Sequence, residues 1–318
     1  MKNILKTAIL ILLAIFAGAA IAADAVDCPP APVMPTVAQA QAAMKAARDH
    51  GFLWSISKDG RTSYLFGTIH VAKMEWMFPG PQIMQALRTS DAMALELDMA
   101  DADIMQRMSK AMAQQQGTVL PAPLAQRMQQ QMQRACISQD AVKKMIPEMQ
   151  VILLVIAMAR RDGVDPTFAI DAFLANLGHG SKMTVVSLET PESQLDLLKM
   201  PTPQATLIMV ERSLDDLENG QARALTNKIV KVWEDADYNT LEHYKDWCNC
   251  LNTEIERKQM ARLLDERNPA MAERIDTLHS AGQSVFAAVG SLHMVGDAGL
   301  PALLKKRGYL VERIDLKP

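Results

Sequence analysis

The chain lacks the sequence motifs of four well-known classes of site. It has no Gly-x-Ser-x-Gly elbow, no phosphate-binding Gly-Lys-Ser/Thr loop, no His-Glu-x-x-His helix and no Gly-x-Gly-x-x-Gly fingerprint. Serine hydrolase, nucleotide-binding and dehydrogenase functions therefore lose support.

Long apolar runs and an excess of positive charge are also missing. Beyond the amino terminus no segment has 18 or more uninterrupted apolar residues, so the sequence predicts no stable membrane span. The 33 Lys and Arg residues are outnumbered by 36 Asp and Glu residues, which disfavours nucleic-acid binding. With 318 residues, 49% of them hydrophobic, the chain can still bury a large core.

The first 22 residues have the pattern of a secretory signal peptide. Lys2 and Lys6 precede an apolar run at residues 8–16, and small residues lead up to Ala22. We expect cleavage after Ala22, which would change the formal net charge from -3 to -5 by removing the two lysines. The sequence thus predicts a periplasmic or secreted protein whose residues 23–318 form a single domain.

Four cysteines form an even set in a chain that is expected to be exported. They are Cys28, Cys136, Cys248 and Cys250, and oxidation is allowed outside the cytoplasm. A one-residue spacing rarely gives the Cα separation of a disulfide, so we expect Cys28 and Cys136 each to bond one member of the Cys248 and Cys250 pair. Which bonds which stays open. The alternative is a soft-metal site at the Cys-Asn-Cys segment with His243 nearby.

Alternating strand-like and helix-like segments predict an α/β fold. Residues 52–57 and 62–66 flank Lys58-Asp59-Gly60-Arg61, which predicts a hairpin at an antiparallel edge. Further strands are expected at residues 92–98, 168–171, 184–189, 285–289 and 309–314, and helices at 82–87, 172–177, 241–264, 269–281 and 300–307, with a turn at 178–180. We expect a mixed, mostly parallel sheet flanked by helices, with helical insertions at about 102–168 and 191–282.

Methionines recur at helical spacing in the first insertion. Met105, Met108 and Met112 share one face, and Met128 and Met132 are four residues apart. Helix packing is the simplest interpretation. The alternatives are a pliable groove for a peptide or lipid and a thioether copper site.

One tetrapeptide pattern occurs twice, as Gly67-Thr68-Ile69-His70 and Gly290-Ser291-Leu292-His293. Each copy ends a short β-rich run and precedes a loop, a helix and another strand, so the unit of strand, Gly-x-x-His, helix and strand is duplicated. A glycine lets the backbone turn sharply and lets a ligand approach. Two histidines in matched settings predict one composite site.

The predicted strand ends bring further polar residues to the same edge. His70, Glu96, Glu189 and His293 would all lie at carboxyl ends of strands, where ligands collect in open α/β sheets. Histidine and carboxylate donors suit zinc, manganese or iron, and such an ion can acidify water for amide or ester hydrolysis. The alternatives are structural histidines and ordinary charges at strand ends. For Asp171 the alternative to a role in the site is that it caps the helix that follows it.

Taken together, the ordered motifs resemble the TraB/GumN/TIKI family over nearly all of the mature chain, in particular its exported, GumN-like bacterial members. The matching segments are residues 65–70, the strand that contains Glu96, residues 170–171, residues 188–190 with Gln194, residues 267–268, and residues 289–293 followed by Gly296, residues 299–300 and residues 308–309. The resemblance implies an α/β fold related to the haem-binding ChaN and erythromycin-esterase groups.

The same resemblance implies an active centre. His70 and His293 match the motif histidines and Glu96 matches the family's glutamate, while Glu189 and Arg267 match recurrent positions. TIKI members are membrane-tethered proteases that use manganese or cobalt, although this chain has no second apolar anchor.

These matches give the leading hypothesis, an exported metal-dependent hydrolase of peptides or proteins. His70, His293, Glu96 and Glu189 would bind manganese, cobalt or zinc. Glu96 would be a ligand or the general base, and Arg267 would stabilise a developing oxyanion. The alternatives are a non-catalytic protein that binds a peptide or haem and a metal-free, esterase-like hydrolase.

Overall fold

The computed structural model describes residues 28–316. The predicted signal peptide, residues 1–22, lies outside this range. Within it, no helix is long and apolar enough to cross a membrane.

The described residues form a six-stranded sheet with the order β4-β3-β5-β2-β1-β6. Strands β4, β3, β5 and β2 are mutually parallel, whereas β1 runs antiparallel to both β2 and β6. The strand bounds are β1 Phe52–Lys58, β2 Arg61–Thr68, β3 Ala92–Leu95, β4 Thr184–Ser187, β5 Val285–Gly290 and β6 Leu310–Ile314. The predicted mixed, mostly parallel α/β fold is confirmed.

The predicted hairpin is confirmed, but it does not form the edge of the sheet. Asp59 and Gly60 both have positive φ angles, of 53° and 74°, and make the two-residue turn between β1 and β2. Strand β6 pairs along the outer side of β1, so the edge that we expected from the hairpin is formed by the carboxyl-terminal strand instead.

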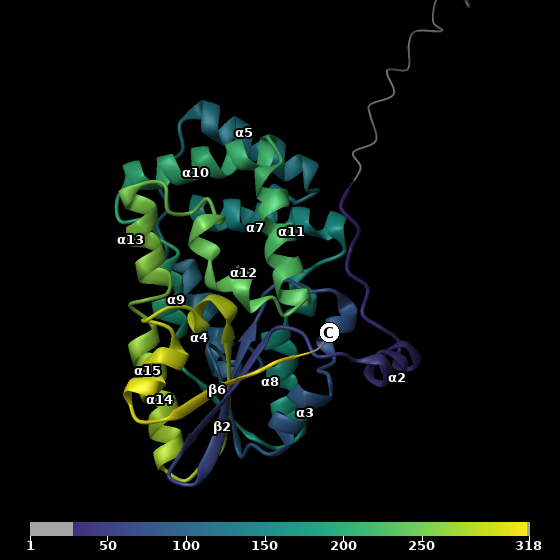
Figure 1. Cartoon of the computed structure of the whole chain (residues 1–318). Coiled ribbons are helices and arrows are strands. Elements are labelled where there is room, and N and C mark those ends of the chain that lie inside the picture. Colours follow the sequence, from purple (N-terminus) through teal and green to yellow (C-terminus); the bar gives the residue numbers. More distant parts are fainter. Residues whose placement is uncertain (1–27, 317–318) are drawn as a thin grey trace, which may run out of the picture.

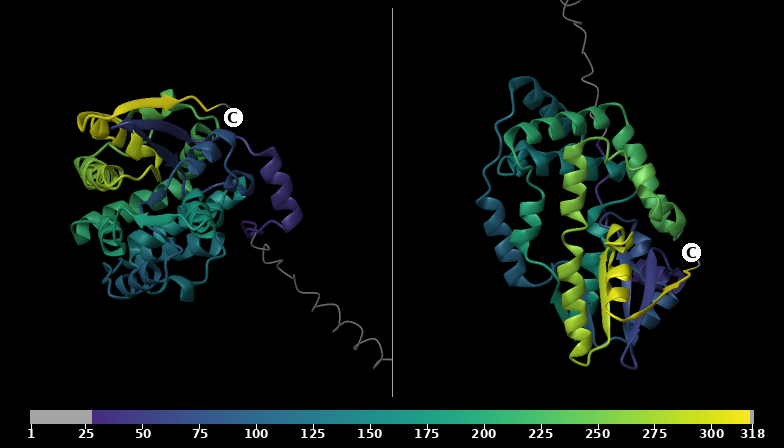
Figure 2. Two further views of the ribbon diagram at one scale, coloured as in Figure 1. Left: turned by 90° about the horizontal axis from the view of Figure 1, so that it is seen from below. Right: turned by 60° about the vertical axis from the view of Figure 1, so that its left-hand side comes forward.

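Helices cover both faces of the sheet (Figures 1 and 2). Helices α3 (Pro81–Arg88) and α8 (Ile170–Gly180) lie on one face, and α14 (Asn268–Ser280) and α15 (Leu300–Lys306) on the other. Because both faces are covered, the central strands β3 and β5 are apolar and buried along nearly their whole length.

Further helices come from the two insertions: α5, α7, α10 and α11 lie beyond the carboxyl ends of the parallel strands, in the upper part of Figure 1, and α4 and α9 lie lower, beside the sheet. Their bounds are α4 Ala102–Ala113, α5 Ala122–Arg134, α6 Gln139–Val142, α7 Pro147–Ala159, α9 Pro191–Leu197, α10 Pro203–Glu218, α11 Gln221–Glu234, α12 Tyr238–Glu242 and α13 Glu254–Leu263. Short 3-10 turns are η1 Met74–Met77, η2 Arg160–Asp162, η3 Pro166–Phe168, η4 Tyr244–Asp246 and η5 Ser291–Met294, and α2 (Val37–Ala46) precedes the hairpin.

The methionines of the helical layer divide into two groups. Met128 and Met132 of α5 are buried in a second apolar cluster with residues of α7 and α10, which confirms packing for this pair. Met105 of α4 is exposed, so the packing interpretation does not hold for it.

The predicted strand at residues 168–171 is wrong. Pro166–Phe168 form a 3-10 turn capped by the Asp165 side chain, and Ile170 already begins α8. Proline has no N–H to give to a sheet and favours the first position of a helical turn. The predicted turn at 178–180 is also wrong, because α8 continues through Gly180.

The predicted helix at residues 241–264 is interrupted. Helix α12 ends at Glu242, and α13 begins only after Thr253, which forms a capping box with Glu256. The loop between them carries a disulfide bond.

The expected disulfide pairing is wrong. Cys28 bonds Cys136, and Cys248 bonds Cys250. Asn249 between the last two adopts a left-handed conformation with a φ of 53°, which places the two Cα atoms 5.1 Å apart, within the range of disulfides. With both thiols in a disulfide, the alternative of a thiolate metal site at this loop is also excluded.

Candidate active site

The two Gly-x-x-His motifs are in contact at the carboxyl ends of β2 and β5. These strands are parallel neighbours, with Gly67 opposite Val289 and Thr68 opposite Gly290. The Ser291 hydroxyl donates a hydrogen bond to the Thr68 carbonyl at 2.8 Å. Strand pairing and this hydrogen bond therefore hold the two motifs side by side.

His70 lies in the loop directly after β2, and its side chain is 64% exposed. Its Nδ1 donates to Oδ2 of Asp171 at 2.8 Å, and the Thr68 hydroxyl donates to Oδ1 of the same carboxylate at 2.6 Å. The charge of Asp171 raises the pKa of His70 against the opposing effect of desolvation, and the hydrogen bond to Asp171 adds to the increase. With Nδ1 engaged in this way, Nε2 is the atom that faces the site.

His293 lies in η5 and is buried. Its Nδ1 is 2.5 Å from Oδ1 of Asn268, whose Nδ2 donates to the Ala298 carbonyl at 2.8 Å. Because that carbonyl can only accept, Oδ1 of Asn268 must accept from His293, and Nδ1 carries the proton. Burial is the main reason that the pKa of His293 falls to about 4. The ring is therefore neutral at pH 7, and Nε2 has a free lone pair.

Glu96 follows β3 and is also buried. Oε1 accepts from the Gly290 N–H at 2.7 Å and lies 3.8 Å from Nε2 of His293. Burial alone would raise the pKa of Glu96, but Arg267, the Gly290 N–H and the rings of His70 and His293, which are both protonated in the acid range where Glu96 titrates, outweigh it and lower the pKa to about 2. Glu96 is thus a carboxylate at neutral pH.

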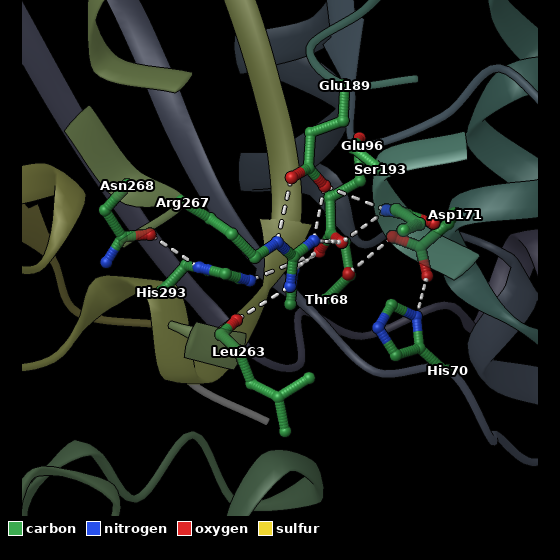
Figure 3. Close-up of polar contacts among 12 residues, drawn as sticks. Thr68, His70, Glu96, Asp171, Glu189, Ser193, Leu263, Arg267, Asn268 and His293 are labelled. Atoms are coloured by element: carbon green, nitrogen blue, oxygen red, sulfur yellow. Dashed lines mark hydrogen bonds and ion pairs between the residues drawn. The ribbon is translucent and has the colours of Figure 1, made fainter. Parts of the chain in front are cut away.

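These three side chains converge on Gly290 from different elements. A Cβ atom placed on Gly290 would lie 3.3 Å from Oε1 of Glu96, 3.4 Å from Nε2 of His70 and 3.7 Å from Cδ2 of His293. A larger residue would therefore fill the space that they share. Figure 3 shows the two imidazoles on either side of the Glu96 carboxylate.

Arg267 lies between Glu189 and Glu96 and bonds both carboxylates (Figure 3). Nη2 of Arg267 donates to Oε2 of Glu96 at 2.6 Å and also to Oε2 of Glu189, and Nε donates to Oε1 of Glu189 at 2.8 Å. Nη1 donates to the Leu263 carbonyl, and Gln194 Nε2 donates to both carboxylates. Both oxygens of Glu189 are thus occupied by protein donors, and three nitrogens of Arg267 by protein acceptors.

The donor chemistry of the centre fits a divalent cation. Two imidazole Nε2 atoms, each fixed by a partner on Nδ1, and one carboxylate oxygen are typical ligands for zinc or manganese. At pH 7 a cation would displace a proton from Nε2 of His70, because the pKa of that ring is raised to about 9. Within residues 28–316, however, no three His, Cys, Asp or Glu side chains already stand at the spacing of metal ligands.

A cavity of about 370 Å³ opens directly beside the centre. His70, Glu96, Arg267 and His293 line one part of it, and the turn η4 and helices α11, α12 and α13 contribute mainly hydrophobic side chains. A substrate in this cavity would therefore contact the polar centre and an apolar wall together.

Sequence analysis missed the roles of two residues. Asp171 holds His70 and does not cap α8, which was the alternative considered for it, and Asn268 holds His293. The available signal was that both residues belong to segments, 170–171 and 267–268, that carry the family resemblance.

Comparison with known proteins assigns the family. The profile of the TraB/PrgY/gumN family matches residues 52–313, which include both histidine motifs and all six strands but the last residue of β6. The chain belongs to this family. The sequence-based resemblance to it is thereby confirmed.

Three proteins with similar sequences are named as metalloproteases. The chain is 23% identical to metalloprotease TIKI2 of Danio rerio over 321 residues, and 22% identical to the metalloprotease TIKI homolog of Nematostella vectensis over 323 residues. Each alignment covers 83% of this chain, but only 61% and 67% of the respective relative. Metalloprotease TIKI1 of Xenopus tropicalis is 23% identical, with 62% of its length covered. No solved structure matches the chain significantly.

Proposed function

We propose that this chain is a metal-dependent hydrolase of peptides or proteins. Nε2 of His70, Nε2 of His293 and Oε1 of Glu96 would hold the cation. The observation that carries the proposal is their convergence on Gly290, with the Nδ1 atom of each ring held by a separate partner. Such a cation supplies Lewis-acid polarisation of a carbonyl and lowers the pKa of water.

The names of the relatives support the choice of reaction. Three of them are called metalloproteases, and the similarity extends over 83% of this chain. Manganese, cobalt and zinc all accept a donor set of two histidines and a carboxylate.

The surrounding residues would act by positioning the donors. Asp171 and Asn268 would orient the two imidazoles, and Arg267 would hold Glu96 in its ionised form. Glu189 would in turn hold Arg267, since both of its oxygens are engaged there. The roles expected from the sequence, Glu189 as a fourth ligand and Arg267 as an oxyanion donor, stay predictions that require these bonds to rearrange.

We also propose that the protein acts in the periplasm or after secretion. Both disulfide bonds fit an oxidising compartment, as does the signal-peptide pattern before Ala22.

The test is peptide cleavage by protein that has been treated with a chelator and then supplied with manganese, cobalt or zinc. We expect cleavage, measured by mass spectrometry, to return with metal and to be lost in His70→Ala and His293→Ala. His243→Ala is the matched control, because that ring is exposed and, within residues 28–316, its hydrogen-bond partner is the Asn239 carbonyl of the adjoining helix α12. Its activity should equal that of the unmodified chain.

Other outcomes would identify the alternatives. Chelator-insensitive cleavage of esters would indicate a metal-free hydrolase. Tight binding of a peptide or haem without turnover under any of the three metals would indicate a binding protein.

A further inference from the structure

The cavity beside the centre has two chemically distinct parts. Most of its polar groups belong to the centre or to the histidine motifs, namely those of Thr68, His70, Glu96, Arg267, Ser291 and His293. Apart from Gly290, the other lining residues are hydrophobic, although Tyr244 adds a hydroxyl; the indole N–H groups of Trp233 and Trp247 already bond backbone carbonyls. Among the described residues, no charged side chain outside the centre lines the cavity, and Lys228, whose Nζ is 4.6 Å from the centroid of the Trp247 ring, is not a lining residue.

The hydrophobic part is built by segments that follow one another in the helical layer. Ile229 and Val232 come from α11, Trp247 from the loop after η4, and Met260 and Leu263 from α13. Ile229 is 42% exposed, so this side of the cavity reaches the surface. Burying an unpaired charge among these side chains is costly, whereas burying an apolar side chain is favourable.

The size of the cavity restricts what can enter. A volume of about 370 Å³ lies near the lower end of the roughly 300–1,000 Å³ found for small-molecule pockets. A cavity of this volume can hold a single large side chain with its neighbouring backbone. A peptide bond beside such a side chain would place a polar carbonyl at the donors and the apolar group against the helices.

We infer that the cavity is a specificity pocket that selects peptides with a large apolar side chain, such as Leu, Met or Phe, next to the bond that is cut. The inference rests on the proposed hydrolase function, which it extends by naming the substrate class. Ile229 and Met260 would be specificity-determining residues, because they line the apolar part from two different helices.

The experiment compares Ile229→Glu and Met260→Glu with Ile255→Glu. Ile255 is a matched control, since it lies on α13, is 37% exposed and does not line the cavity. Peptides that differ only in the residue beside the cut bond are digested with manganese present. We expect kcat/KM for Phe peptides to fall about tenfold or more in the two pocket variants, mainly through KM, and to be unchanged in Ile255→Glu.

Peptides with Ala at this position should be little affected by any of the variants, and peptides with Lys should be cut better by the two pocket variants. Equal cleavage of Phe, Ala and Asp peptides by the unmodified chain would overturn the inference. So would equal effects of all three substitutions.

A binding measurement separates failure of the pocket from failure of the hydrolase function. N-acetyl-phenylalaninamide and the α-amide of N-acetyl-aspartic acid, which keeps its side-chain carboxylate, are titrated into the metal-free protein, with the fluorescence of Trp233 and Trp247 in the cavity wall as the signal. We expect binding of the phenylalanine derivative only, weakened in Met260→Glu. If no peptide is cut but this preference holds, the hydrolase proposal fails and the pocket stands. Equal binding of the two compounds, or none, overturns the pocket.

Discussion

Replacing Arg267 by methionine is expected to destabilise the metal-free protein strongly. The three side chains involved are nearly inaccessible, with exposures of 12% for Arg267, 11% for Glu96 and 10% for Glu189. Removing one partner of a buried ion pair costs about 3–5 kcal/mol because the other charge is left unpaired. Here one cation is shared by two carboxylates.

Protonation limits the size of this loss. A glutamate with an ordinary pKa of 4.5 can take up a proton at pH 7 at a cost of about 3 kcal/mol. The Arg267→Met variant should therefore lose about 3–5 kcal/mol of unfolding free energy at pH 7, and less at pH 5. Adding Glu189→Gln to the variant should recover part of the loss, because one of the two uncompensated charges is then absent.

Urea unfolding of chelator-treated protein measures these differences. Arg127→Met is the matched control, since Arg127 also binds two carboxylates, those of Asp215 and Glu218, but near the surface. It should lose only about 0–1 kcal/mol. A loss of the same size in both arginine variants, or no recovery in the Arg267→Met/Glu189→Gln double variant, would refute the claim that Arg267 neutralises a buried pair.

Three further predictions concern the positioning of ligands, pH and the first disulfide. Asn268→Ala should weaken manganese binding about 10–100-fold in a calorimetric titration, because the His293 tautomer is no longer fixed, and unchanged affinity would argue against this role. The unfolding free energy of the metal-free protein, measured in urea, should decrease as the pH falls below about 6.5. Between pH 6.5 and 4 the unfolded chain binds a proton at His293 that the folded protein (pKa about 4) does not, and between pH 4.5 and 2 the same holds for Glu96 (pKa about 2). A flat profile over this range would contradict both shifts. Cys28→Ser with Cys136→Ser should cost up to about 4–5 kcal/mol in the same assay, the chain-entropy value for a sequence separation of 108, and equal stability would show that this bridge adds nothing.

The sheet was largely predictable because local pattern and tertiary structure agree in it. The run before Gly67 and the run before Gly290 are β-rich and end at glycine, and both form parallel strands whose ends meet. The hairpin follows from Asp59 and Gly60, which adopt positive φ angles readily. The edge of the sheet to which His70, Glu96 and His293 belong could therefore be predicted, although β3 ends at Leu95 rather than at residue 98 and β4 at Ser187 rather than at residue 189.

Features that depend on one backbone angle or on a distant partner could not be assigned. The Cys248–Cys250 bond depends on the left-handed conformation of Asn249, which the pattern of the neighbouring residues does not predict. Asp171 was expected to act locally, but its partners lie about a hundred positions earlier in the sequence. The ion pair between Glu189 and Arg267 likewise joins residues that are 78 positions apart, so no local pattern predicts it.

The most direct test of the proposed centre is equilibrium binding of manganese to the purified chain by calorimetry. The proposal predicts one ion per chain and unchanged affinity in His243→Ala. In His70→Ala and in His293→Ala the affinity should fall by more than the roughly 10–100-fold that is typical of losing a residue that only orients a metal ligand. Binding that is equally tight in all four proteins, or absent for manganese, cobalt and zinc alike, would contradict it.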